Sequence, residues 1–333
     1  MSNYTVTTKD MGTSGFGPAF SGTLVPTYDG LAPTPWHVPV NPEFVFDQVD
    51  AMRILVQAWI REQTRPEHAH RKGVYLHGPT GSGKTTLPEQ FFARLGVPLI
   101  RTTWSPKREA EEMIASKTII GGDLLPVDQA IAIAARNGYP VLINEIDLAD
   151  PAELVNLNDV IEKGLIVLPD GTSFTAARGF FVCATANTAG EGDETGNYHG
   201  TGPLNGSTLR RFYSVEVGYP TEEAEVAFLQ TQLPSVGKDL LEAVAKVVTR
   251  IRQAYTGTLD GKRLASPISR PETVDWIELM GRFAYLKSRG IAVAEYAMGF
   301  AFANRLSRKD QLVVEELVKS VFSAAPGAQG STP

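Results

Sequence analysis

Short apolar runs alternate with helix-compatible segments through the middle of this chain, between residues 74 and 217. Runs of this length, rich in Val, Ile and Leu, are typical of strands buried on both faces of a parallel sheet. Strands that alternate with helices therefore predict an α/β domain with a mostly parallel sheet covered on both sides. The predicted strands are Val74–His77, Val97–Arg101, Pro140–Asp147, Phe180–Ala184 and Val215–Val217.

The helices expected around these strands are marked by apolar spacing and by end signals. The apolar residues of Phe44–Arg61 recur at the spacing of an amphipathic helix. Asp150 is a typical N-cap, and the helix that it opens would end at Gly164. An Asp-Gly pair between two β-prone arms predicts a hairpin over residues 165–175. The other predicted helices are Thr86–Leu95, Lys107–Lys117 and Pro126–Asn137.

The pattern changes on both sides of this region. Residues 1–42 are rich in Gly, Thr, Ser and Pro and show no period, so we expect an extended arm that docks on a neighbour, or a loose terminus. Residues 43–220 form the predicted α/β domain. From Thr221 the pattern is helical and predicts a small helical domain over residues 221–323, followed by a disordered tail, 324–333.

Composition is ordinary for a globular protein of 333 residues, with 43% hydrophobic and 20% charged residues. A net charge of -6 and a pI near 5.5 argue against a nucleic-acid partner, which usually requires a basic face. The single cysteine, Cys183, excludes an internal disulfide and suits a reducing compartment. No apolar run is long enough to span a membrane and the N-terminus lacks signal-peptide features, so we expect a cytoplasmic protein without membrane attachment.

The candidate chemistry begins at Gly78–Thr85, whose sequence GPTGSGKT fills the spacing G-x-x-x-x-G-K-[ST]. A strand before it and a helix after it are the context of a phosphate-binding loop, which disfavours a chance match by a glycine-rich turn. Lys84 would neutralise the β- and γ-phosphates, and the Thr85 hydroxyl would ligate Mg²⁺. The predicted nucleotide-binding residues are Gly78, Pro79, Thr80, Gly81, Ser82, Gly83, Lys84, Thr85 and Thr86.

Hydrolysis also needs a group that orients water and positive charge against the developing phosphate charge. Glu145 ends a buried strand and could polarise the water. The alternative role, a carboxylate that only caps the next helix, suits Asp150 better than Glu145. Asn187 ends the next strand and could hold the same water. Alternatively, its side chain could serve only to stabilise the turn after the strand. Arg211 and Arg270 are the candidate cations, although a single arginine is usually a solvated surface residue.

In this order, the motifs resemble those of AAA+ ATPases of the MoxR type. They are the phosphate loop, the strand ending in Asn144-Glu145, Ala184–Asn187, Leu209–Phe212 and Ser269–Pro271. Within that family the chain looks like the branch of CbbQ, NorQ, GvpN and CobS. Residues 184–201 (ATANTAGEGDETGNYHGT) are most similar to the CobS subunit of cobaltochelatase. The resemblance covers residues 45 to about 320.

This resemblance implies an α/β AAA+ domain with a C-terminal helical lid, using ATP and Mg²⁺. It makes Gly78–Thr85 the Walker A motif and Asn144-Glu145 the Walker B motif, with Asn144 toward the metal. Asn187 becomes sensor 1. Arg211 becomes the arginine finger that acts in trans, and Arg270 becomes sensor 2 from the lid.

The resemblance also implies a homo-oligomer, a hexameric ring. Residues 102–125 fall at the helix-2 insert of this branch and residues 165–175 at the pre-sensor-1 hairpin, both of which line the ring's pore. Members commonly act with a von Willebrand A domain protein to remodel or metallate a client enzyme. Such a partner and client are therefore expected here.

Two positions depart from the family pattern. Asn144 stands where Walker B normally has Asp, and its amide oxygen carries no charge, which predicts a weaker hold on Mg²⁺-bound water and slow hydrolysis. Asp147 would share a strand face with Glu145, so it would not simply replace the missing charge. Arg210 stands where Asp is frequent, which leaves Arg210 and Arg211 both open as the finger, with Arg211 favoured by its place before Phe212.

Three functions stay open on the sequence. The first is a ring-forming ATPase that remodels or metallates a protein client. The second is a nucleotide-gated scaffold whose hydrolysis is weak because of Asn144. The third is a nucleic-acid-associated NTPase motor, against which the acidic charge counts.

Overall fold

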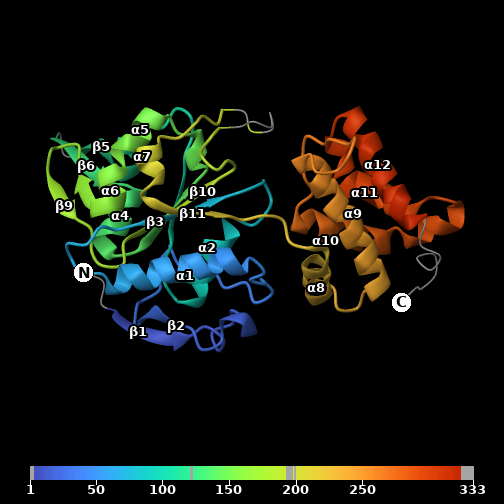
Figure 1. The fold of residues 1–333 in the computed structure, drawn as a ribbon, viewed down its shortest axis with the longest axis horizontal. Coiled ribbons are helices and arrows are strands. Elements are labelled where there is room, and N and C mark those ends of the chain that lie inside the picture. The colour runs from blue at the N-terminus through green and yellow to red at the C-terminus, as the bar shows by residue number, and fades with distance from the viewer. Residues whose placement is uncertain (1–3, 121–122, 193–197, 199, 324–333) are drawn as a thin grey trace. The chain divides into compact units, whose positions relative to one another are not determined.

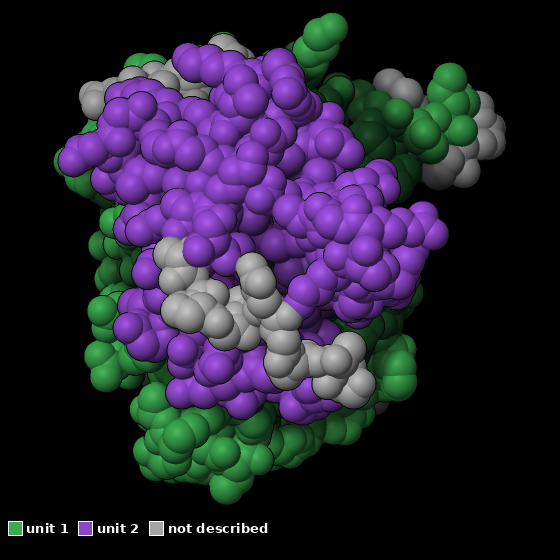
Figure 2. Space-filling model, turned by 90° about the vertical axis from the view of Figure 1, so that its right-hand side faces the viewer, with its two compact units in different colours: residues 1–78, 83–218 green, residues 79–82, 219–333 purple. Residues whose placement is uncertain are grey.

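The computed structural model describes residues 4–120, 123–192, 198 and 200–323. It divides into two compact units, which Figure 2 distinguishes by colour. The first unit comprises residues 1–78 and 83–218, and the second comprises residues 79–82 and 219–333. Each unit has a hydrophobic core of its own. The predicted tail, residues 324–333, lies outside the described residues.

A five-stranded sheet with the order β11-β3-β10-β7-β4 forms the centre of the first unit (Figure 1). All of its pairings are parallel. Every residue of β10 is buried, as expected for a central strand with both faces covered. The predicted parallel α/β sheet is thus confirmed. Its strands are β3 (Gly73–His77), β4 (Ile100–Thr103), β7 (Pro140–Asn144), β10 (Phe181–Ala186) and β11 (Phe212–Glu216).

Helices connect the strands and cover the sheet. In α1 the residues Met52, Leu55 and Trp59 are fully buried on one face, which is the amphipathic pattern that the sequence predicted. Leu154 of α5 is buried likewise, behind the N-cap hydrogen bond that Asp150 accepts from Ala152 N at 2.8 Å. The helices are α1 (Val49–Thr64), α2 (Thr86–Arg94), α3 (Ala110–Ile114), α4 (Ala130–Asn137), α5 (Pro151–Asn156), α6 (Asn158–Lys163) and α7 (Gly206–Leu209).

The N-terminal segment is folded into the first unit, where the sequence predicted an arm or a loose terminus. Strands β1 (Thr5–Asp10) and β2 (Leu24–Asp29) pair antiparallel and lie beside α1 (Figure 1). The side chains of Phe16 and Phe20, at or near a 3₁₀ turn (Pro18–Phe20), are buried. The prediction failed because these aromatic residues pack from loops, so their spacing carries no period.

Two antiparallel hairpins extend the first unit. Strands β8 (Leu165–Val167) and β9 (Ser173–Thr175) confirm the predicted hairpin over residues 165–175. Strands β5 (Ala115–Ile120) and β6 (Asp123–Asp128) correct the predictions for the preceding region. The helix expected over Lys107–Lys117 is only the short α3, and the helix expected from Pro126 begins at Ala130. Strand pairing between the two arms prevails over their local helix signals.

The second unit is helical in all of its described regular elements, as predicted. Its core includes the fully buried Trp276, Val248 and Val318. No helix in the described part of the chain is long and apolar enough to cross a membrane. The α-helices are α8 (Glu222–Gln232), α9 (Lys238–Thr256), α10 (Arg270–Arg282), α11 (Val293–Ala301) and α12 (Arg308–Phe322), with 3₁₀ helices at Ala284–Arg289 and Ala303–Arg305.

Candidate functional site

The carboxyl ends of three neighbouring strands bring the predicted site residues to one edge of the sheet. Strand β3 ends at His77, directly before the phosphate loop, and His77 lies opposite Ala186 of β10. Strand β7, on the other side of β10, ends at Asn144. In parallel α/β sheets ligands bind outside these ends. The loop, Asn144, Glu145 and Asn187 therefore form one candidate site.

The loop backbone depends on glycine. Gly78 has φ +147°, and a Cβ there would lie 2.3 Å from the carbonyl oxygen of Val217. Gly83 also has a positive φ, +94°. Other side chains would strain this path, so the backbone rules out most substitutions. Within the loop, Ser82 N donates to Pro79 O at 3.3 Å. Helix α2 begins at Thr86, directly after the loop. The remaining predicted loop residues are Pro79, Thr80, Gly81 and Ser82.

Lys84 is buried, with 8% of its surface exposed, and its Nζ donates to Gly78 O at 2.7 Å. Burial lowers the pKa of Lys84 to about 8, while the negative charges of Asp147 and Glu145 act in the opposite direction. A buried cation of this kind is stabilised by an anion placed against it. The environment of Lys84 is thus suited to a phosphate group.

A single oxygen joins the phosphate loop to strand β7. Asn144 Oδ1 accepts hydrogen bonds from Thr85 Oγ1 and from Thr185 Oγ1, each at 3.1 Å. The predicted metal pair, Thr85 and Asn144, is therefore in direct contact. Hydroxyl and amide oxygens are hard donors, and Mg²⁺ in nucleotide sites keeps several waters and few protein ligands. These two side chains fit Mg²⁺.

Glu145 is exposed and follows β7 with φ +55°, the one positive φ outside glycine among the described residues. Its N–H donates to Thr185 Oγ1 at 3.3 Å. A left-handed backbone is strained for glutamate, and such strain is concentrated at functional sites. The turn ends the strand and leads into a 3₁₀ helix (Ile146–Leu148).

Asp147 is a site residue that the sequence analysis placed incorrectly. The expected strand face shared with Glu145 does not exist, because β7 ends at Asn144. Asp147 is instead fully buried, and its Oδ2 accepts from Asn187 N at 2.8 Å and from Thr188 N at 3.1 Å. Burial raises the pKa of Asp147, against the lowering effect of these N–H groups. The carboxylate fixes the backbone where Asn187 leaves β10.

The two candidate finger arginines differ in their surroundings. Arg211 Nη2 lies 2.8 Å from Glu162 Oε2, and its Nη1 donates to Ser207 O. Arg210 is exposed, and its Nε donates to Gly206 O within its own turn at 3.3 Å. Both belong to the first unit, at the boundary between α7 and β11.

Arg270 belongs to the second unit, at the start of α10. Its Nε lies 3.1 Å from Glu225 Oε2, and its guanidinium lies over the Phe228 ring at 4.4 Å. The fully buried Glu225 also pairs with Arg252 at 3.1 Å. Glu225 is thus shared by the Arg270 and Arg252 guanidiniums.

Comparisons with known proteins bear directly on this site. Residues 73–201, which contain the phosphate loop, Asn144, Glu145 and Asn187, match the AAA domain of the dynein-related subfamily. Residues 73–201 thus form an AAA domain, which supports the predicted resemblance to AAA+ ATPases of the MoxR type. An AAA+ domain is a nucleotide-binding domain, so the family supports the phosphate loop as a nucleotide site.

Several curated proteins are similar to this chain. The aerobic cobaltochelatase subunit CobS of a Sinorhizobium species is 25% identical over 295 residues, which are 86% of this chain and 83% of that protein. An uncharacterized protein of Staphylococcus haemolyticus is 34% identical over 155 residues, 44% of this chain and 56% of that protein. One of Staphylococcus epidermidis is 30% identical over 182 residues, 53% of this chain and 66% of that protein. The similarity to CobS thus extends beyond the AAA domain.

Proposed function

We propose that this protein is a ring-forming ATPase that couples ATP binding and hydrolysis to remodelling or metallation of a protein client. The observation that carries the proposal is the contact of Thr85 with Asn144, which joins the phosphate loop to the strand end that bears Glu145. Similarity to a cobaltochelatase subunit over most of the chain supports metallation as the client reaction.

The proposed roles follow from position. Lys84 binds the β- and γ-phosphates, and Thr85 and Asn144 hold Mg²⁺. When bound, Mg²⁺ neutralises phosphate charge. Glu145, exposed next to this pair, polarises the attacking water, and Asn187 orients it. Because Asn144 contributes no charge, the metal is held more weakly than by a carboxylate.

Assembly and partners form the finer part of the proposal. Arg211 acts on the nucleotide of an adjacent copy in a hexameric ring, and Arg270 acts from the helical second unit. The hairpins β5–β6 and β8–β9 expose Ile119 (75%) and Val167 (51%), which supports a role in contacting a client. A von Willebrand A domain protein is the proposed partner. The buried, free Cys183 suits a reducing compartment, and we propose the cytoplasm.

A second candidate is a nucleotide-gated scaffold with little hydrolysis, which the uncharged Asn144 favours. It predicts tight ATP binding, little turnover in the natural chain and turnover restored by Asn144→Asp. A nucleic-acid motor predicts stimulation by DNA or RNA and is opposed by the net charge of -6.

Steady-state ATP hydrolysis over a range of protein concentrations tests the proposal. We expect specific activity to rise with protein concentration and to be lost in Glu145→Gln. Glu216→Gln, an exposed carboxylate at the end of the edge strand β11, is the matched control and should retain activity. If ATP is hydrolysed only by the Asn144→Asp variant, the result supports the nucleotide-gated scaffold instead. Turnover that rises only with added DNA or RNA supports the nucleic-acid motor.

A further inference from the structure

The candidate finger Arg211 is held by a carboxylate of its own chain. Its Nη2 lies 2.8 Å from Glu162 Oε2, and its Nη1 donates to Ser207 O. Both partners of the ion pair are partly buried, with 24% of the Arg211 side chain and 28% of the Glu162 side chain exposed. Arginine–carboxylate pairs with this degree of burial are screened less by water than surface pairs.

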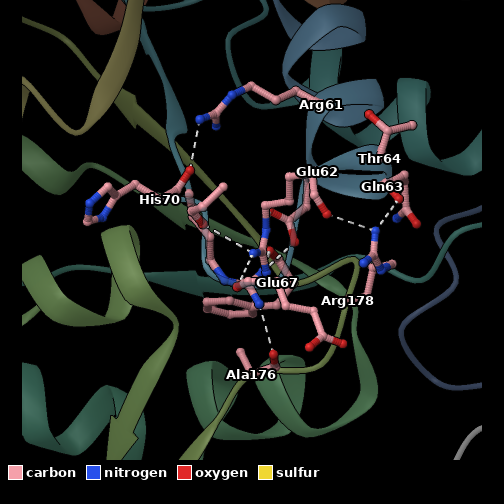
Figure 3. Close-up of polar contacts among 12 residues, drawn as sticks. Arg61, Glu62, Gln63, Thr64, Glu67, His70, Ala176 and Arg178 are labelled. Atoms are coloured by element: carbon pink, nitrogen blue, oxygen red, sulfur yellow. Dashed lines mark hydrogen bonds and ion pairs between the residues drawn. The ribbon is translucent and has the colours of Figure 1, made fainter.

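The backbone of Glu162 is held from behind by Arg71. The N–H of Arg71 donates to Glu162 O at 2.7 Å, which anchors the end of α6. The Arg71 guanidinium is buried against Glu62 and donates to Ala176 O and Phe180 O, each at 2.8 Å. Figure 3 shows Glu62 and Ala176 on opposite sides of this cluster. The Arg71 guanidinium, which has all of these partners, is therefore held in a single position.

A second contact reaches Glu162 from the loop after α1. His70 Nδ1 lies 3.5 Å from Glu162 Oε1, and the backbone of His70 is held by Arg61 Nη2, which donates to His70 O at 2.8 Å (Figure 3). Nearby, Arg178 donates to Gln63 O at 2.8 Å. The loop and the end of α6 are thereby joined, so the position of Glu162 is decided by the fold of the first unit.

A finger that acts in trans needs an arginine side chain whose orientation is set before the neighbour arrives. An unrestrained arginine loses rotamer entropy when it is fixed. We propose that Glu162 is a positioning residue for Arg211, holding its guanidinium ready for the nucleotide of an adjacent copy of this chain. The inference rests on the proposed ATPase function, and it selects Arg211 over the exposed Arg210 as the finger.

A double-mutant cycle in the full chain tests whether Glu162 acts through Arg211. We expect Glu162→Gln to lower kcat by roughly 5- to 30-fold with little change in KM for ATP, because transition-state contact is lost and ground-state binding is kept. Arg211→Ala should lower kcat further, and the double variant should be no slower than Arg211→Ala alone. Asp159→Asn, which breaks an exposed pair with Lys163 in the same helix, is the matched control and should keep wild-type kcat.

Mixing variants tests whether the arginine acts on a neighbour. A Glu145→Gln subunit has an inactive site of its own but carries a correctly held Arg211. Added to Glu162→Gln subunits, it should therefore raise turnover per Glu162→Gln site. If the arginine acts within its own chain, the addition only dilutes active sites.

Several outcomes overturn the inference while leaving an ATPase in place. These are additive losses in the cycle, a rise in KM without a fall in kcat, dilution alone in the mixing test, or loss of turnover in Arg210→Ala with Arg211→Ala active. Absence of turnover in both the wild type and Asn144→Asp would instead overturn the proposed function and the inference together. Circular dichroism melting of each variant checks that a lost activity is not a lost fold.

Discussion

The carboxylate of Asp147 accepts the backbone N–H of Asn187 at 2.8 Å and so ties the turn after β7 to the end of β10. The same oxygen accepts from Thr188 N and Thr188 Oγ1. Since Asp147 is fully buried, its removal takes the acceptor away from these donors inside the protein. The position of Asn187 therefore depends on a residue that need not contact nucleotide.

Asp147→Ala should reduce both stability and turnover. The substitution leaves buried donors at Asn187 and Thr188 without an acceptor, which costs about 2–4 kcal/mol of unfolding free energy. Asp147→Asn keeps one acceptor oxygen and should restore much of the stability. Urea unfolding and ATP turnover of both variants give the comparison. Equal turnover in Asp147→Ala and the wild type would show that Asn187 needs no such support.

Asn144→Asp should lower the Mg²⁺ concentration needed for half-maximal ATP hydrolysis. An aspartate can still accept from Thr85 and Thr185, and it adds a negative charge beside the metal. Asn144→Leu, which removes the acceptor but keeps the size, should raise the Mg²⁺ requirement. The measurement is a Mg²⁺ titration at fixed ATP. If all three proteins have the same Mg²⁺ dependence, Asn144 does not hold the metal.

ATP binding should take up protons near pH 8. Burial lowers the pKa of Lys84 to about 8, so a fraction of the nucleotide-free protein carries neutral Lys84 at that pH. Phosphate favours the charged form and raises this pKa, so affinity should fall as pH rises through 8. Calorimetry in two buffers of different ionisation enthalpy measures the uptake. Lys84→Arg stays charged and should show none, whereas equal uptake in both proteins would assign it to another group.

Deletion of residues 1–30 should destabilise the first unit. Trp59 of α1 donates to Pro26 O at 2.9 Å, and Tyr28 donates to Gly138 O at 2.8 Å. Loss of these bonds and of several buried aromatic side chains should cost more than about 5 kcal/mol of unfolding free energy. Thermal unfolding of the truncated chain provides the test, with Leu24→Thr on the exposed face of β2 as control. Unchanged stability together with lost self-association would restore the arm hypothesis.

The sequence by itself determined the phosphate loop, the parallel sheet and the helical second unit. These features depend on short-range information. The spacing of the glycines and Lys84 in Gly78–Thr85 indicates a local backbone conformation, and the apolar runs indicate strands that are buried on both faces. The order of motifs also led to the AAA+ family, because Asn144-Glu145 and Asn187 stand at the ends of two predicted strands.

Only the tertiary structure decided the contacts between segments far apart in sequence. The helix signal at Pro126 is local, and strand β6 forms there instead because its pairing with β5 is stronger. The buried Phe16 packs from a loop against Phe91 of α2, which no period can signal. The bonds from Asp147 to Asn187 and from Glu162 to Arg211 join residues about 40 to 50 positions apart. Which donor meets which carboxylate follows from how the strands are ordered in the sheet, and a single sequence carries no direct record of that order.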